Sequence, residues 1–479
     1  MKNKTMKRLV QGLTVLILAF AIFLAGRYSA RYHLLAPSPA SDSNVQSLTG
    51  QDFQMLSDLN ATIQHFYIED VNKTDLLEGA MKGMVQALGD PHSEFLNKQE
   101  SVSFDDDIDG SFEGVGIQIA SRDGQIVVIS PIEDTPASQA GIQPNDILLE
   151  ADGQELTGMD TGEVVSLIRG PKGSSVKLKL QRGSDSFEVE LERAEIPIHS
   201  VKGQLDEDDS DLGYVQINQF SGTTSDELQA AVEDLREKGA KKFIFDVRFN
   251  PGGLMDQALK VANMFVEEGQ VLMQTDDGHQ DPTVYKADQK EYGDFKITEP
   301  YVLLVNEGSA SASEILAAAI KENTDHDLVG TQTFGKGSVQ TILTQNDLGE
   351  LKLTIARWLT PTGQWIHEEG VEPTQVVEAD PVSQALLVSD PSKLEAGKSS
   401  PETKSIAMIL DRLGYQTNQS DYFDDQLEAA IKDFQQANDL EATGQVDEAF
   451  LTELYQEIRD YLQANDRQYQ AAKEVLDKQ

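Results

Sequence analysis

The stretch V-N-E-G-S-A-S-A-S-E-I-L-A-A-A-I, from Val305 to Ile320, decides the fold of this chain. The apolar run Tyr301–Val305 leads into it and predicts a buried strand, and a helix is expected to begin at about Ser313. Small residues between a strand and a helix let a substrate backbone approach closely, and the positive end of the helix favours a developing negative charge. The stretch therefore predicts a place for a nucleophile.

A second motif, G-T-Q-T-F-G-K-G-S-V-Q-T from Gly330 to Thr341, places Lys336 between two glycines. A serine needs a base, and a lysine can serve where burial disfavours its charged form. Gln340 follows four residues later and has a side-chain carbonyl that could hold the amine. None of the seven histidines lies in an obvious triad context: His33, His65, His92, His199, His279, His326 and His367. On spacing alone, a plain strand-to-helix turn with a loop lysine is an equal alternative.

These motifs and D-V-R-F-N-P-G-G-L at Asp246–Leu254 resemble the carboxyl-terminal processing peptidases, also called tail-specific proteases. The three motifs occur in the order and at the spacing of that family. The resemblance implies a Ser-Lys dyad supported by a glutamine. It makes Ser311 the nucleophile, Lys336 the general base and Gln340 the partner that orients the base.

The resemblance also implies an oxyanion hole made of backbone N–H groups. One donor is expected from Ala312 and the other from Gly252 or Gly253, with Gly253 favoured but not separable from its neighbour. Ser309 and Ser313 flank the nucleophile in the same motif and are not expected to replace it.

The turn after Asp246 departs from the family at one position. Phe249 stands where the family usually has a polar residue, and we expect it to change the wall of the site rather than the chemistry. Asp246 and Arg248 are interpreted as structural partners that fix the turn, rather than as an acid–base pair.

Length and charge narrow the classes of function. A chain of 479 residues should hold about three domains. The net charge of −42, from 81 acidic and 39 basic residues, argues against a nucleic-acid partner. There is no cysteine, so neither disulfides nor thiolate–metal chemistry is available. We expect neither a metal nor an organic cofactor.

The N-terminus predicts a membrane anchor over residues 1–34. A basic segment with Lys2 and Arg8 precedes the apolar run Leu9–Gly26. At ~1.5 Å per residue this run spans roughly 27 Å, close to a bilayer core. The basic residues place the N-terminus in the cytoplasm. A cleaved signal peptide is the alternative, because Ala19–Ala21 has the A-x-A form. Hydrophobicity continues past that point, which favours an uncleaved anchor.

Residues 35–50 are predicted to form a linker, and residues 51–108 a helical region. This region could provide the surface of a homodimer. Its apolar residues recur at helical spacing: Phe53, Leu56, Leu59, Ile63 and Phe66, then Leu76, Leu77, Ala80, Met84 and Leu88. His92 lies in the following G-D-P-H-S turn, where we expect it to cap the turn rather than to act in catalysis.

Residues 109–195 resemble a PDZ domain. Gly114, Val115, Gly116 and Ile117 match the loop that binds a peptide carboxylate, and the helix expected at Thr161–Ile168 forms the other wall of the groove. An extended tail would add to the sheet edge while loop N–H groups hold its carboxylate. The alternative is that G-V-G is only a strand bulge in a structural module.

Residues 196–388 alternate strands and helices and read as an α/β protease core, followed by a linker at 389–404. Residues 405–465 resemble a small helical peptidoglycan-binding domain, a motif set that indicates the fold more firmly than the ligand. Residues 466–479 read as a charged helical tail without a motif. The residues expected in the core of the helical domain are Leu410, Leu413, Ile431, Phe434 and Leu440.

The chain is therefore interpreted as an α+β multidomain protein. It would consist of a transmembrane helix, a helical arm, a PDZ domain, a protease core and a small all-α domain. We expect a single-pass serine endopeptidase that cleaves proteins near their C-termini, with its catalytic part outside the cytoplasm, on a Gram-positive-like membrane, and a wall-binding module. The alternative is a catalytically silent scaffold that binds peptide tails and tethers them to the cell wall.

Overall fold

The structure is a computed structural model that describes residues 47–122, 124–344, 349–388, 390–391 and 394–478. Its residues fall into two compact units, the described part of Met1–Ser101 with Gln340–Ile355, and Val102–Val339 with Ala356–Gln479. The predicted membrane anchor lies outside the described residues. Within the described part, no helix is long and apolar enough to cross a membrane.

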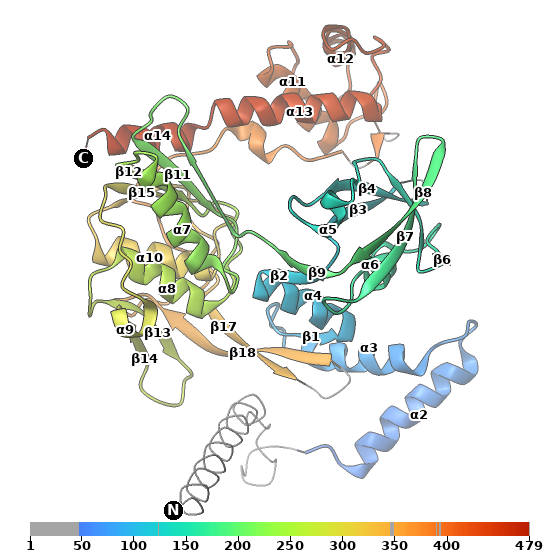
Figure 1. The fold of residues 1–479 in the computed structure, drawn as a ribbon, viewed down its shortest axis with the longest axis horizontal. Coiled ribbons are helices and arrows are strands. Elements are labelled where there is room, and N and C mark those ends of the chain that lie inside the picture. The colour runs from blue at the N-terminus through green and yellow to red at the C-terminus, as the bar shows by residue number, and fades with distance from the viewer. Residues whose placement is uncertain (1–46, 123, 345–348, 389, 392–393, 479) are drawn as a thin grey trace, which may run out of the picture. The chain divides into compact units, whose positions relative to one another are not determined.

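The first unit holds the expected N-terminal helices (Figure 1). Strand β1 pairs antiparallel with the first part of β18, from Glu94 opposite Lys352 to Asn97 opposite Gly349. No residue of α2 or α3 is buried, so the predicted apolar stripes have no buried core beneath them among the residues that the structure describes. The elements are α2 (Gly50–Phe66), α3 (Lys73–Gln86), β1 (Glu94–Asn97), β17 (Ser338–Thr344) from Gln340 onward and β18 (Gly349–Leu359) up to Ile355.

The turn that follows α3 is organised by a carboxylate. Asp90 accepts the backbone N–H of His92 at 3.0 Å and the hydroxyl of Ser93 at 2.6 Å. Burial alone would raise the pKa of Asp90, but hydrogen bonds from Ser93, Thr354 and His92 outweigh it and lower the pKa to about 2. His92 therefore takes part in the turn through its backbone, while Asp90 is the acceptor that closes it.

The second unit begins with α4 (Lys98–Asp109, of which Val102 onward belongs here) and the PDZ domain. Its antiparallel sheet has the order β3-β4-β5-β7-β8, with β6 beside β5. Helix α6 (Thr161–Ile168) has the predicted bounds and contributes Val164 and Ile168 to the apolar core. The other elements are β2 (Ser111–Gly114), β3 (Ile117–Arg122), β4 (Gln125–Pro131), α5 (Pro136–Gln139), β5 (Ile147–Ala151), β6 (Gln154–Glu155), β7 (Ser175–Arg182), β8 (Asp185–Glu192) and β9 (Ala194–Pro197).

The protease core is built on a second sheet, with the order β10-β11-β12-β15-β16-β19. All neighbours are parallel except β10 and β11. The strands are β10 (Val201–Leu205), β11 (Leu212–Ile217), β12 (Lys242–Asp246), β15 (Tyr301–Val305), β16 (Asp327–Gly330) and β19 (Gln375–Val376). The helices are α7 (Thr224–Glu237), α8 (Met255–Phe265), α9 (Gln289–Tyr292) and α10 (Ala312–Asn323). Strands β13 (Val271–Asp276) and β14 (Thr283–Lys286) pair with each other, and β13 also pairs with the last part of β18.

Strand β15 is buried on both faces of this sheet, as its unbroken apolar run predicts. Tyr301, Leu303 and Val305 pack in the main core with α7, α8 and α10, whereas Val302 and Leu304 face the opposite side. A separate helix, α14, covers that opposite face (Figure 1). Since ligands of parallel sheets bind beyond the carboxyl ends of the strands, the loops after β12 and β15 are the place to look for a site.

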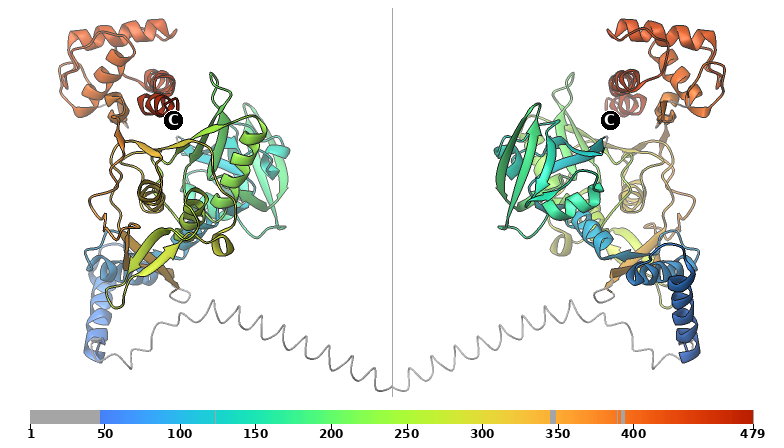
Figure 2. Two further views of the ribbon diagram at one scale, coloured as in Figure 1. Left: turned by 90° about the vertical axis from the view of Figure 1, so that its left-hand side faces the viewer. Right: turned by 90° about the vertical axis from the view of Figure 1, so that its right-hand side faces the viewer.

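The C-terminal helices comprise a helical module with its own core and a last helix that packs on the protease sheet. Val382 and Val388 pack into the core of the helical module, so that core begins before the expected linker. In the region expected as a charged helical tail, helix α14 buries Ala472 and Leu476 against the protease sheet. The red helices of Figure 2 comprise this part of the chain: α11 (Pro401–Arg412), α12 (Asp425–Ala437), α13 (Glu448–Ala464) and α14 (Arg467–Leu476), preceded by the short η2 (Pro381–Gln384).

Candidate active site

Helix α10 begins directly after Ser311, at the carboxyl end of β15. Ser311 has φ 55° and ψ −109°, a conformation that residues other than glycine rarely adopt. Its N–H donates to Glu314 Oε2 at 2.8 Å, and its carbonyl accepts the N–H of Ile315 at 2.9 Å. A serine held in a strained strand-to-helix turn resembles the elbow on which other hydrolases present a nucleophile.

The three serines of the S-A-S-A-S motif have different surroundings. Ser309 is fully buried and donates its hydroxyl to the carbonyl of Val247 at 2.7 Å. Ser313 is also fully buried and donates to the carbonyl of Asn250 at 3.0 Å. Ser311 is half-buried. The outer serines therefore hold the neighbouring turn, and the central serine is the one that a substrate can approach.

Glu314 is a fully buried carboxylate that joins the two catalytic motifs. Besides Ser311, it accepts the hydroxyl of Thr333 at 2.6 Å and the N–H groups of Gly335 at 2.7 Å and Lys336 at 2.9 Å. Sequence reasoning missed this residue. Ser311-x-x-Glu314 has the spacing of a capping box, which is the signal that could have revealed it.

The backbone around Lys336 is fixed by two tryptophans. Trp358 Nε1 donates to the carbonyl of Lys336 at 2.8 Å, and Trp365 Nε1 donates to the carbonyl of Gly337 at 2.9 Å. A Cβ at position 337 would lie 2.7 Å from Trp365 Nε1, so only glycine fits there. These bonds and those to the Glu314 carboxylate together fix the backbone of the loop.

Gln340 and His367 are two further residues that the sequence singled out. Gln340 belongs to the first compact unit, where its Nε2 donates to Thr354 Oγ1 at 3.2 Å. His367 stacks on Trp365 with ring centres 5.1 Å apart. Its Nδ1 is buried and has no hydrogen-bond partner among the residues that the structure describes.

The loop after β12 packs directly against the Ser311 turn. Asn250 anchors it, since Nδ2 donates to the carbonyl of Ile217 at 2.8 Å and Oδ1 accepts the N–H of Gly252 at 2.9 Å. Gly252 has φ 103°, and a Cβ there would lie 2.7 Å from the Ala310 carbonyl oxygen and 2.8 Å from Ser311 Cβ. This close approach requires glycine.

The two glycines of the loop present their N–H groups differently. The Gly252 N–H is used by Asn250. Gly253 forms a parallel bridge with Phe220, in which Phe220 donates to Gly252 and accepts from Leu254. In that pattern the bridged residue points its own N–H away from its partner. Of the two glycines, Gly253 is therefore the one whose N–H is not directed at Phe220 or at Asn250.

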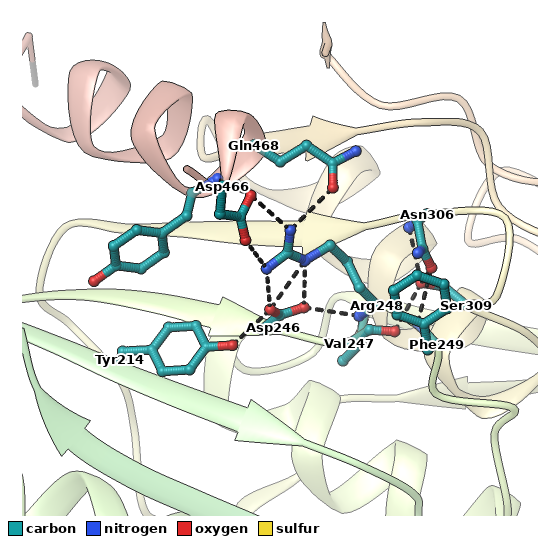
Figure 3. Close-up of polar contacts among 10 residues, drawn as sticks. Tyr214, Asp246, Val247, Arg248, Phe249, Asn306, Ser309, Asp466 and Gln468 are labelled. Atoms are coloured by element: carbon teal, nitrogen blue, oxygen red, sulfur yellow. Dashed lines mark hydrogen bonds and ion pairs between the residues drawn. The ribbon is translucent and has the colours of Figure 1, made fainter. Parts of the chain in front are cut away.

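Asp246 and Arg248 form a buried ion pair at the base of this loop (Figure 3). Arg248 Nη2 lies 2.7 Å from Asp246 Oδ2, and the Arg248 N–H donates to Asp246 Oδ1 at 2.8 Å. Tyr214 donates its hydroxyl to Asp246 Oδ2 at 2.7 Å. Burial opposes the charge of Arg248, but the attraction of Asp246 prevails and raises the pKa of Arg248. The pair fixes the turn, as interpreted from the sequence.

All four residues predicted to bind peptide tails line one cavity of the PDZ domain, with a volume of about 80 Å³. Among the described strands, β3 beside it pairs with β4 alone, so it is an edge strand that can accept an added strand. Gly116 has φ 79°, and a Cβ there would lie 2.4 Å from Thr135 Cβ. The lining residues are Phe112, Gly114, Val115, Gly116, Ile117, Ile119, Val165, Ile168 and Arg169.

Comparison with protein families agrees with this division of the chain. Residues 211–377 match peptidase family S41, and residues 127–182 match a PDZ domain. Residues 399–454 match a peptidoglycan binding domain, and residues 24–100 match the N-terminal domain of the activating protease CtpB.

Similar proteins extend the match to nearly the whole chain. The carboxy-terminal processing protease CtpA of Bacillus subtilis (strain 168) is 36% identical over 462 residues, which cover 96% of this chain and 96% of that protein. CtpB of the same organism is 35% identical over 422 residues, or 86% of this chain and 87% of that protein. A solved photosystem II D1 C-terminal processing protease is 26% identical, covering 72% of this chain and 96% of its own, with a TM-score of 0.40. The chain belongs to the carboxy-terminal processing proteases of peptidase family S41, which are serine-type peptidases, and it carries a PDZ domain and a peptidoglycan-binding domain.

Proposed function

We propose that this protein is an endopeptidase that cleaves protein substrates near their C-termini with a Ser311–Lys336 dyad. One observation carries the proposal. A single buried carboxylate, Glu314, accepts the backbone N–H of both residues, at 2.8 and 2.9 Å. The nucleophile and the base are thereby supported by the same group, although 25 residues separate them in the sequence.

The proposed reaction is acyl transfer. Neutral Lys336 removes the proton of the Ser311 hydroxyl as its oxygen attacks the scissile carbonyl. When the tetrahedral intermediate collapses, the C–N bond breaks and Lys336 returns the proton to the leaving amine. Water then attacks the ester, with Lys336 again acting as base, and releases the second product. Gln340 orients the amine through Oε1, since its Nε2 donates to Thr354.

The oxyanion of each intermediate would be bound by the N–H groups of Ala312 and Gly253. Ala312 is the first residue of α10, where N–H groups have no partner within the helix. Gly253 is preferred to Gly252 because the Gly252 N–H donates to Asn250. Two backbone donors aimed at the developing charge are the usual means of stabilising such an intermediate.

Recognition of the substrate tail is assigned to the PDZ groove. The tail would extend the sheet at β3, and the N–H groups of the Gly114–Ile117 loop would hold its terminal carboxylate. Strand addition pairs the tail with β3 through its backbone, and the lining side chains of the groove would contact alternate side chains of the tail. Binding of the terminal carboxylate explains why cleavage would follow the position of the C-terminus.

Cleavage of an unstructured protein tests the dyad. The wild type should degrade it, whereas Ser311→Ala and Lys336→Ala should lose at least about 10³-fold in kcat. Lys290→Ala, which removes an exposed lysine, is the control and should behave as wild type. Equal cleavage by both dyad variants would refute the proposal. Peptide-tail binding without cleavage by any form, wild type included, would establish the scaffold alternative.

The pH dependence is a second test, because only the neutral amine can act as a base. The kcat/KM value should rise as pH increases towards the reference lysine pKa of about 10.4. A profile that stays flat down to about pH 5 would contradict a lysine base.

We also propose an uncleaved membrane anchor at Leu9–Gly26, a catalytic part outside the cytoplasm, and peptidoglycan binding by the C-terminal module. The sequence of residues 1–34 supports the first two assignments, and the family match at 399–454 supports the third. Membrane fractionation, protease accessibility in intact cells and sedimentation with purified sacculi test the three assignments. Release of full-length protein into the medium would contradict the anchor.

The helical arm is proposed to pair with a second copy of this chain. Helix α2 exposes Phe53, Met55, Leu56 and Leu59, and it buries none of its residues. A short helix with no packed face is marginal in water, so a partner surface is needed to stabilise it. Sedimentation of the soluble portion should show a dimer that Leu59→Glu converts to a monomer. A wild-type monomer at all concentrations would contradict this assignment.

A further inference from the structure

The C-terminal helix α14 completes the protease core. Ala472 and Leu476 are buried against Ile244, Val302 and Leu304, which form the sheet face opposite α7, α8 and α10. Without α14 these fully buried strand side chains would face water, because among the described residues no other helix packs into this apolar cluster. The last helix of the chain is thus part of the catalytic domain.

Polar contacts at three places, its two ends and its middle, attach α14 to the core. Asp477 lies 2.9 Å from Lys242 at its C-terminal end. In its middle, Lys473 lies 2.9 Å from Asp206, which also accepts the hydroxyl of Tyr469 at 2.6 Å. The contact at its N-terminal end differs from these two, because it reaches the active-site loop.

At that end, the side chains of Asp466 and Gln468 bind the guanidinium of Arg248 (Figure 3). Asp466 Oδ2 lies 2.7 Å from Arg248 Nη2, and Asp466 Oδ1 accepts from Nη1 at 3.0 Å. Gln468 Oε1 accepts from Nη1, also at 3.0 Å, while its Nε2 donates to the carbonyl of Val377 at 2.9 Å. The guanidinium is therefore held between α14 on one side and Asp246 on the other.

Arg248 belongs to the turn that leads into the oxyanion loop. The turn continues through Phe249, whose φ is 58°, to Asn250, which accepts the N–H of Ala310 at 3.0 Å. Asn250 also binds Gly252, which packs on Ser311. A shift of Arg248 would therefore move the glycines that present the oxyanion donor.

We propose that Asp466 is a positioning residue for the oxyanion loop and acts through Arg248. This deepens the proposed function and rests on it, since it concerns the support of the same oxyanion hole. Asp466 makes no contact with a substrate. Its carboxylate fixes the direction of a guanidinium, and the guanidinium fixes the turn from which Gly253 is presented.

The position of Asp466 gives the C-terminal module a direct connection to the site. Helix α13 contributes Phe450, Leu454 and Ile458 to the core of that module. It ends at Ala464, and only Asn465 and Asp466 separate it from α14. A displacement of the module, for example on binding its ligand, would be transmitted to Arg248 through this short connection.

The test compares Asp466→Asn with Asp477→Asn in the otherwise intact chain. Asp466 also caps α14 by accepting the N–H of Tyr469 at 3.0 Å, and asparagine keeps this role. Asp466→Asn therefore removes the charge beside Arg248 and retains the helix. Asp477→Asn removes an ion pair of the same helix that does not touch Arg248. Asp466→Ser, which also preserves the cap, is the second variant.

We expect Asp466→Asn to lower kcat by about threefold to tenfold, with KM within about twofold of wild type. Binding of a peptide aldehyde, whose adduct places an oxyanion in the hole, should weaken by the same factor as kcat. Binding of the product peptide should not change. Asp477→Asn should match wild type in all three measurements. Ser311→Ala, assayed in parallel, reports separately on the dyad.

Two results would overturn the positioning role. One is a kcat and an aldehyde affinity that stay at wild-type values in both Asp466 variants. The other is an equal loss in Asp466→Asn and Asp477→Asn, which would show that α14 acts only by holding the fold together. Cleavage by Ser311→Ala at the wild-type rate would instead refute the proposed dyad.

Discussion

The two sides of the candidate site are supported in different ways. On the nucleophile side, Ser311 and the Lys336 loop share Glu314, which is 0% exposed and lies within the protease core. On the oxyanion side, Arg248 depends partly on Asp466, whose side chain is 26% exposed and belongs to the last helix of the chain. One support is internal, and the other comes from a segment more than 200 residues further along the sequence.

This difference suggests a division of roles. A fully buried network has one arrangement at ordinary stability, so the geometry of Ser311 relative to the Lys336 backbone should be constant. A partly exposed contact at the end of a helix can open at small cost. The oxyanion side is therefore the one through which the rest of the chain could modulate the rate.

The largest effect is expected from Glu314→Gln. The amide keeps the size of the carboxylate, but one of its two acceptor oxygens becomes an NH₂ group. In one orientation the NH₂ group faces the N–H donors of Ser311 and Lys336, and in the other it faces the N–H donor of Gly335. Unsatisfied buried donors cost about 1–3 kcal/mol each, and misplacement of the reacting groups costs about 100-fold or more in kcat. Steady-state kinetics and thermal unfolding measure the two losses.

The control for that change is Glu322→Gln on the same helix. Glu322 also accepts a backbone N–H, that of Thr362 at 2.8 Å, but at an exposed position. It should leave kcat unchanged. Equal kinetics for both variants would show that Glu314 does not hold the catalytic motifs together.

A loss of about 100-fold in kcat/KM is expected from Gly252→Ala. The new Cβ would lie 2.8 Å from Ser311 Cβ, which forces the two loops apart. Gly239→Ala is the matched control, because Gly239 has a similar φ of 110° but nothing within 4 Å of an added Cβ. It should cost about 1 kcal/mol of stability and no activity. If both variants keep full activity, the loops do not need their close contact.

A smaller effect concerns the attachment of α14. Burial raises the pKa of Asp206, but hydrogen bonds from Tyr469 and Lys473 outweigh it, so the pKa is lowered in the folded chain. Because the pKa of Asp206 is lower in the folded chain than in the unfolded chain, the ionised carboxylate stabilises the fold above the unfolded pKa of about 3.9. This stabilisation is lost as pH falls through the folded pKa. Asp206→Asn should reduce the free energy of unfolding at pH 7 by about 0.5–1 kcal/mol. The difference from wild type should shrink below pH 4, and a constant difference would contradict the assignment.

The smallest effect is expected from Phe249→Asn, and it should be stabilising. Phe249 has φ 58°, a region in which asparagine is several times commoner than phenylalanine, and its side chain is 71% exposed. We expect a gain of about 0.5 kcal/mol with kcat unchanged. Thermal unfolding and kinetics measure both quantities, and a large fall in kcat would mean that the phenyl ring takes part in the site.

The sequence allowed the strand–turn–helix at Ser311, the glycine loop and the PDZ groove to be predicted, because each depends on residues close together in the chain. The unbroken apolar run of β15 also indicated a buried strand. It did not show what covers the second face, since the helix that carries Ala472 and Leu476 is remote in the sequence and has no motif that links it to the sheet. The link between Asp466 and Arg248 spans 218 residues and leaves no local signal.

The central claim is that Lys336 activates Ser311, and covalent labelling tests it most directly. The intact chain and Lys336→Ala are treated with a fluorophosphonate, the adduct is located by peptide mapping, and its rate of formation is followed against pH. The account predicts one adduct, on Ser311, whose rate rises with pH in the wild type and falls by about 100-fold or more in Lys336→Ala. An adduct on Ser309 or Ser313, or equal rates in the two proteins, would contradict it.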